Sequence, residues 1–309
     1  MCGIRVVVAA FAATVLAVGC GGAGAQSETV EGKIQATTTT THVTDLVRSV
    51  GGDEVEVTAL MGPGVDPHLY EASQGDISAL RDADVVFYHG MFLEGRLAEI
   101  LERVEQQNPA VQVTEGLPEA RLLASEDYEG QADPHVWFDP ELWEMTVDPV
   151  VEQLSELKPE SAEVFERNGE AYREEIRASD AYVRERIEEI PEENRVLVTA
   201  HDAFGYFGET YGVEVRALQG ISTESEAGAG DVRALAEELA RDRVPALFTE
   251  SSIPQRNIEA VQAAAQDRGW DLRIGGELYA DAMGDPETEA GTYPGMMRAN
   301  ADTMAEALG

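Results

Sequence analysis

A long helical pattern separates two halves of this chain, each of which alternates strands with helices. Pro159 suits the first position of a helix, and Pro191 ends the pattern. Apolar residues recur along it at helical spacings and form one stripe: Phe165, Tyr172, Ile176, Val183, Ile187 and Ile190. A helix over residues 159–190 would be ~46 Å long at ~1.5 Å per residue, which suffices to join two lobes stiffly. The stripe alone also fits a surface helix of one large domain.

Short runs rich in β-branched residues alternate with helical patterns on both sides of this helix. The expected strands are 34–41, 55–60, 85–88 and 111–114, then 196–199, 213–218, 246–249 and 272–274. The expected helices are 43–50, 77–80 and 93–104, then 232–240 and 257–267. Such alternation is typical of parallel sheets. We predict an α/β fold with an N-terminal lobe at 33–158, a linking helix at 159–190 and a C-terminal lobe at 191–309.

The first residues of the chain are typical of an export signal. Arg5 precedes an uncharged, largely apolar run at residues 6–18, shorter than the ~20 residues that a membrane-spanning helix needs. The run ends in the sequence LAVGC at residues 16–20, which looks like a bacterial lipobox, in which the cysteine, here Cys20, is lipidated before cleavage. We predict a lipoprotein signal peptide at 1–19 and a flexible tether at 20–32. The alternative is a soluble secreted protein that is cleaved elsewhere.

The cysteine content agrees with a lipid-anchored protein. The chain has 2 cysteines, Cys2 and Cys20, so cleavage before Cys20 would leave no pair for an internal disulfide. No later apolar run in the sequence is long enough to span a membrane. We therefore expect an exported protein that contacts the cell membrane only through its lipid anchor and faces the periplasm or the outside.

The charge balance excludes nucleic acid as a partner. The sequence has 59 acidic residues against 22 lysines and arginines, which gives a net charge of −37. Such a surface repels the phosphates of nucleic acid. It cannot gain binding free energy by releasing the counterions that surround them. The same composition is typical of a protein kept soluble at high salt, although an ordinary acidic exported protein also fits.

Side chains that can bind metals follow several of the expected strands. His42, His68, His89 and His201 each come after a strand, and Glu250 ends another. Open α/β sheets bind ligands outside the carboxyl ends of their strands, so these side chains lie on the expected edge. The tripeptide Asp-Pro-His occurs at 66–68 and at 133–135, where proline stiffens the turn before the histidine.

The spacing of these residues leaves the metal site open as a hypothesis. A lone histidine is more often structural, and Asp-Pro is a common turn. The histidines also lack the short spacing of a local motif such as His-Glu-x-x-His. The isolated glycines at 228–230 and 275–276 do not match a phosphate-binding loop, and the sequence contains no nucleophile elbow.

Four segments carry a resemblance to a known family. They are MGPGVDPHLY at 61–70, DPHVWFD at 133–139, HDAFGYF at 201–207 and GGELYADAMG at 275–284. In this order they resemble the zinc/manganese-type substrate-binding lipoproteins of ABC importers (cluster A-I), and most closely the TroA-like members. The resemblance runs from about residue 36 to the C-terminus.

The resemblance implies two α/β lobes joined by one long rigid helix, with a metal in the cleft between them. Carried over position by position, the ligands are His68 and His135 from the first lobe and His201 and Asp281 from the second. The implied protein is not an enzyme. It would capture zinc or manganese as cargo and deliver the ion to the transmembrane subunit of an ABC permease. The pattern of strands does not by itself predict a role for Asp281.

The donor set leaves the identity of the metal open. Three imidazoles and one carboxylate suit a borderline divalent ion, and the Irving–Williams order favours zinc. Relatives with a second carboxylate in place of His201 favour manganese, so His201 favours zinc or mixed use. The loop at 124–132 has none of the histidines found there in many zinc-type relatives, which keeps manganese open. Because imidazoles bind metals only when neutral, we expect affinity to fall below about pH 6.

Three further residues are candidates for supporting roles. His42 and His89 stand where the family is expected to have an apolar residue and an asparagine. Each is either an accessory ligand or donor, or a structural histidine. Glu250 is a candidate hydrogen-bond acceptor for a ligand imidazole, or else a partner for an arginine.

Two other functions fit parts of the pattern. A zinc-dependent hydrolase would use three protein ligands and keep one position for water. An adhesion lipoprotein would hold a structural metal that does not exchange.

Overall fold

The computed structural model describes residues 32–125 and 130–309. The predicted signal peptide at 1–19, the lipid on Cys20 and nearly all of the tether at 20–32 lie outside the described residues. Among the helices that are described, none combines the length and the apolar character that a membrane crossing requires.

The first lobe is built on a four-stranded parallel sheet of order β2-β1-β3-β4. Its strands are β1 (Ile34–Thr38), β2 (Val55–Ala59), β3 (Val85–Tyr88) and β4 (Ala110–Gln112). Its helices are α1 (Thr41–Gly51), α2 (Gln74–Asp82), α3 (Ala98–Glu105), α4 (Pro140–Met145) and α5 (Val147–Leu157). Thr38 at the end of β1 pairs with Ala59 and Phe87, so the carboxyl ends of three strands meet at one edge.

The second lobe pairs its strands two by two. β5 (Val196–Thr199) runs parallel to β6 (Glu214–Ala217), and β7 (Ala246–Glu250) runs parallel to β8 (Arg273–Leu278). Its helices are α7 (Gly205–Tyr211), α8 (Ala229–Asp242), α9 (Arg256–Gln266) and α10 (Tyr293–Leu308). The Glu250 carboxylate, at the end of β7, accepts hydrogen bonds from the backbone N–H groups of Ala200 and His201. These bonds hold the end of β7 beside the end of β5.

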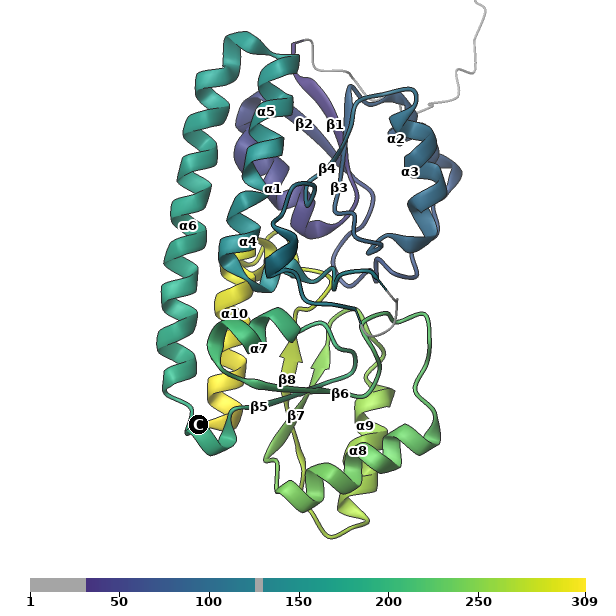
Figure 1. Cartoon of the computed structure of the whole chain (residues 1–309), viewed down its shortest axis with the longest axis vertical. Helices are drawn as coiled ribbons and strands as arrows, with labels where there is room; N and C mark the ends of the chain where they lie inside the picture. The colour runs from purple at the N-terminus through teal and green to yellow at the C-terminus, as the bar shows by residue number, and fades with distance from the viewer. Residues whose placement is uncertain (1–31, 126–129) are drawn as a thin grey trace, which may run out of the picture. The chain divides into compact units, whose positions relative to one another are not determined.

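One long helix links the two lobes, as predicted. α6 (Ala162–Glu188) has 27 residues and follows a 3₁₀ turn at Pro159–Ser161. It runs alongside both lobes in Figure 1. The Tyr172 hydroxyl donates to Asp45 of α1 at 2.9 Å, and Arg186 pairs with Asp302 of α10 at 2.7 Å. All six residues of the predicted stripe are buried. The two-lobed α/β fold with its linking helix is therefore confirmed.

The sequence analysis missed several elements and misplaced the start of others. The helices α4, α5, α7 and α10 were not predicted. The buried face of α10 consists largely of methionine and alanine, which make a weaker apolar stripe than branched residues. The helix expected at 93–104 begins only at Ala98, after a 3₁₀ turn at Gly95–Leu97. Met91 and Phe92 have φ values of 54° and 63°, a left-handed conformation that a helix cannot include.

The glycines at 275 and 276 serve packing. A Cβ added to Gly275 would lie 2.7 Å from both Phe248 and Ala307, closer than carbon atoms can approach. Glycine therefore lets α10 pack directly onto β8, which continues to Leu278 instead of ending near 274 as expected. Asp281 follows this strand by a few residues.

The buried stripe of α6 predicts a stability effect. Ile176 is fully buried in the core, and replacing it with alanine should lower the free energy of unfolding by ~2–5 kcal/mol. Glu174 on the same helix is exposed, so Glu174→Ala is the matched control and should change stability by less than ~0.5 kcal/mol. Urea unfolding of the metal-free protein measures both. Equal effects would show that the stripe does not carry the packing of α6.

Candidate metal centre

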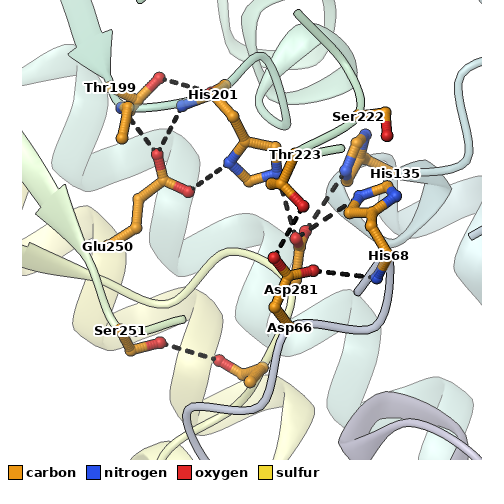
Figure 2. A network of polar contacts seen from close by, with 12 residues as sticks. Asp66, His68, His135, Thr199, His201, Ser222, Thr223, Glu250, Ser251 and Asp281 are labelled. Carbon is orange, nitrogen blue, oxygen red and sulfur yellow. Dashed lines mark hydrogen bonds and ion pairs between the residues drawn. The ribbon is translucent and has the colours of Figure 1, made fainter. Parts of the chain in front are cut away.

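Four loops that are far apart in the sequence bring the predicted ligand residues to one place. His68 lies between β2 and α2, His135 precedes the 3₁₀ turn Val136–Phe138, His201 follows β5, and Asp281 follows β8. One ligand atom from each residue can be chosen so that all of them lie within 4.8 Å of one another. Figure 2 shows the three imidazoles turned toward the Asp281 carboxylate.

The carboxylate of Asp281 is the common neighbour of the three histidines. Its oxygens lie 3.6 Å from Nε2 of His68, 3.3 Å from Nε2 of His135 and 3.1 Å from Nε2 of His201. His135 and His201 are fully buried, while His68 retains 4% exposure and Asp281 2%. Water therefore has little access to the polar atoms of this cluster.

Outside the cluster itself, these inward-facing atoms have no hydrogen-bond partner in the part of the chain that the structure describes. They are the Nε2 atoms of His68, His135 and His201 and both carboxylate oxygens of Asp281. Buried polar atoms in native proteins are nearly always paired. Imidazole nitrogens and carboxylate oxygens that converge without other partners are the atoms that bind a divalent transition metal in proteins. The residues present thus fit a cation at their centre.

Two further carboxylates orient the imidazoles from behind. Asp133 Oδ1 lies 2.7 Å from Nδ1 of His135, and Glu250 Oε2 lies 2.6 Å from Nδ1 of His201. An ionised carboxylate can only accept, so each histidine must donate its Nδ1 proton outward. This leaves the Nε2 lone pair free toward the centre, as a metal ligand requires. Glu250 makes these contacts with His201 and the adjacent backbone instead of pairing with an arginine.

Asp133 is a site residue that the sequence analysis missed. In both copies of Asp-Pro-His, the aspartate Oδ1 accepts the backbone N–H of the histidine at 2.9 Å. This local turn depends on the aspartate as much as on the proline. The repeated tripeptide was therefore the available signal. Asp66 adds a contact between the lobes, because its Oδ2 accepts the Thr223 hydroxyl at 2.7 Å.

His42 and His89 lie outside the cluster of four, against two tryptophans. The His42 ring stacks on Trp137 with 4.4 Å between centroids, and the His89 ring stacks on Trp143 with 6.2 Å. His89 Nε2 is 2.7 Å from the carbonyl of Pro134, the residue before the ligand candidate His135. Burial lowers the pKa of both imidazoles to about 3. They are neutral rings packed behind the centre, and a direct role for either one stays a prediction.

The protonation of the cluster is uneven. Burial lowers the pKa of His68 to about 3. Burial also favours the neutral form of His135, but the carboxylates of Asp133 and Asp281 outweigh it and raise the pKa to about 9. In the same way Asp281 and Glu250 outweigh burial and raise the pKa of His201 well above its usual value. Burial alone would raise the pKa of Asp281, but His201 and His135 hold it well below its usual range.

Nearly the whole chain is similar to known metal-binding proteins. The family model described as "Zinc-uptake complex component A periplasmic" (ZnuA) matches residues 37–307. The chain is 44% identical over 297 residues to the manganese-binding lipoprotein MntA of Bacillus subtilis, which covers 96% of both proteins. It is 45% identical over 285 residues to the zinc-binding protein TroA of Treponema pallidum, which covers 92% of both.

A solved structure has the same fold. The periplasmic zinc-binding protein TroA from Treponema pallidum superposes with a TM-score of 0.87 at 45% identity, over 90% of this chain and 99% of that one. A second TroA structure, from a study of metal-binding specificity, superposes with a TM-score of 0.85 at 34% identity.

The raised pKa values predict that metal binding releases protons. Near pH 7 His135 and His201 are protonated in the metal-free protein, and each must lose its Nε2 proton to bind an ion. Metal affinity should therefore rise with pH up to about 9. On lowering the pH, affinity should begin to fall well above pH 6, the value expected for ordinary histidines. Calorimetry of zinc binding in buffers with different ionisation enthalpies counts the protons. Binding without proton release at pH 7 would contradict this assignment.

Glu250 offers a test of how His201 is oriented. In Glu250→Gln the amide nitrogen can donate to Nδ1 of His201, which would move the imidazole proton to Nε2 and block the ligand position. We expect metal affinity to fall about 10–100-fold, the usual effect of losing such a partner. Glu277→Gln, an exposed change on the neighbouring strand β8, is the control and should bind as the wild type does. Unchanged affinity in Glu250→Gln would remove this role.

Proposed function

The chain belongs to the ZnuA family of metal-binding components of uptake complexes, and from that premise we propose that it captures zinc or manganese outside the cytoplasm and delivers the ion to an ABC permease. One observation supports the proposal above all. Three imidazole nitrogens and one carboxylate, all buried, converge without other hydrogen-bond partners. We propose that His68, His135, His201 and Asp281 hold the ion.

The distances within the cluster support this ligand set. A tetrahedral ion with bonds of ~2.0–2.1 Å has its donor atoms about 3.3–3.4 Å apart. The contacts from the two Asp281 oxygens to the imidazoles, at 3.1, 3.3 and 3.6 Å, lie close to that spacing. One donor atom from each of the four residues lies within 4.8 Å of the others, so the cluster would contract around the ion to complete the coordination.

The choice between zinc and manganese follows from the donor chemistry. Three imidazoles favour zinc, and the Irving–Williams order places manganese well below zinc. Both oxygens of Asp281 lack other partners, so the carboxylate can bind through both and raise the coordination number toward what manganese prefers. The manganese-binding and zinc-binding relatives are nearly equally similar, at 44% and 45% identity. We infer a site that accepts either ion and holds zinc more tightly.

Reversible binding distinguishes this function from the alternatives. Four protein donors fill the positions of a tetrahedral ion, whereas a zinc-dependent hydrolase keeps one position for water. An adhesion lipoprotein with a structural metal would not need exchange. A family of uptake components favours cargo that is taken up and released. We further propose that Cys20 carries the lipid anchor and that the transmembrane subunit of the permease is the partner.

Replacement of Asp281 tests the proposal. Asp281→Asn removes the charge that the three imidazoles surround, and we expect at least a hundredfold loss of zinc and manganese affinity. Asp285→Asn alters an exposed carboxylate a few residues later and serves as the control. Titration of the chelator-treated protein, together with elemental analysis of the protein as purified, measures both. The proposal fails if the wild type binds neither ion, or if Asp281→Asn binds as tightly as the control.

A further inference from the structure

The segment that carries Asp281 is hydrogen-bonded to the opposite lobe. Asp281 follows β8 of the second lobe, yet the backbone N–H of Met283 donates to the hydroxyl of Thr41 at 2.9 Å. Thr41 is the first residue of α1 in the first lobe. Both residues are buried, with 3% of Met283 and 9% of Thr41 exposed. This bond joins positions 242 residues apart in the sequence.

Residues of the second lobe form hydrogen bonds with the same segment on either side of Asp281. The Asn300 side chain of α10 accepts from the N–H of Tyr279 at 2.9 Å and donates to its carbonyl at 2.8 Å. The Ser251 hydroxyl donates to the carbonyl of Ala282 at 3.3 Å, a contact drawn in Figure 2. Asp281 therefore lies between an anchor to its own lobe and an anchor to the other lobe.

The first lobe also holds the end of the loop that follows. The backbone N–H of Tyr293, at the start of α10, donates to Asp45 of α1 at 3.0 Å. The Tyr293 hydroxyl donates to the carbonyl of Trp137 at 2.8 Å, and Trp137 follows His135 by two residues. The chain between Asp281 and α10 is thus attached to the first lobe at Met283 and again at Tyr293.

We propose that Thr41 is a positioning residue for Asp281, which it holds toward His68 and His135 and so slows release of the bound ion. The inference rests on the proposed function. Met283 is two residues from Asp281, so its hydrogen bond limits how far the carboxylate can move away from the first lobe. Without the Thr41 hydroxyl, a buried N–H group loses its partner, and the segment must shift to find another.

This arrangement has a consequence for release of the ion. Asp281 belongs to the second lobe by its place in the chain and by the contacts of Tyr279 and Ala282, but the bond to Thr41 also attaches its segment to the first lobe. While that bond is intact, it resists separation of the lobes beside Asp281. Complete release then requires the bond between Met283 and Thr41 to break.

Two substitutions at Thr41 test the proposal. Thr41→Val replaces the hydroxyl with a methyl group of similar size, and Thr41→Ser retains the hydroxyl. We expect zinc to dissociate about 10–100-fold faster from Thr41→Val, the range for loss of a supporting contact to a ligand. Thr41→Ser should dissociate within about twofold of the wild type. Stopped-flow transfer of Zn²⁺ to an excess of chelator measures the rates, and thermal unfolding of the metal-free proteins shows whether stability changed.

Ser251→Ala is the matched control, because it removes the second lobe's contact to the same segment. It should accelerate release less than Thr41→Val does. The proposal is overturned if Thr41→Val releases zinc at the wild-type rate, or if Ser251→Ala has an equal effect. If Thr41→Val does not fold, hydrogen exchange of the Met283 amide in the zinc-loaded wild type decides, because fast exchange contradicts the bond and strong protection supports it. Failure of the wild type to bind zinc would instead reject the proposed function.

Discussion

A buried carboxylate among three imidazoles is the interaction on which the centre depends. An ionised Asp281 that is 2% exposed carries a large desolvation penalty unless positive charge lies beside it. In the metal-free protein, the raised pKa values of His135 and His201, to which Asp133 and Glu250 also contribute, favour protonated rings that supply that charge. Under the proposed function, a divalent ion supplies it instead when bound, and the ion and the protons compete for the same Nε2 atoms.

The carboxylates behind the imidazoles act on both the protonation and the orientation of the rings. Asp133 and Glu250 accept hydrogen bonds from Nδ1 of His135 and His201, so Nε2 of each ring faces inward. They also raise the pKa of both imidazoles, and under the proposed function they add negative charge close to the ion. Because Glu250, at the end of β7, accepts from the backbone of the two residues that follow β5, the orientation of His201 is part of the packing between the strand pairs.

The two lobes share more than the four residues of the cluster. α6 packs along both lobes through a continuous buried stripe, and α10 returns beside it with its first residue bonded to α1. The Thr223 hydroxyl and the Met283 amide add contacts on either side of the cluster. Separation of the lobes would break these hydrogen bonds, so under the proposed function release of the ion is coupled to the contacts between the lobes.

Local patterns predicted the linking helix and the strands at 85–88 and 196–199, and they placed His68 and His201 in loops that follow strands. Periodicity and strand–helix alternation depend on neighbouring residues, so the sequence shows them directly. Resemblance was needed for Asp281, since a lone carboxylate after a strand has no pattern of its own. The pairing of strands in the second lobe, the contact of Asp133 with His135 and the bond from Met283 to Thr41 came only from the tertiary structure. These features depend on how separate segments meet in space, and no short stretch of sequence records which partner a side chain will find there.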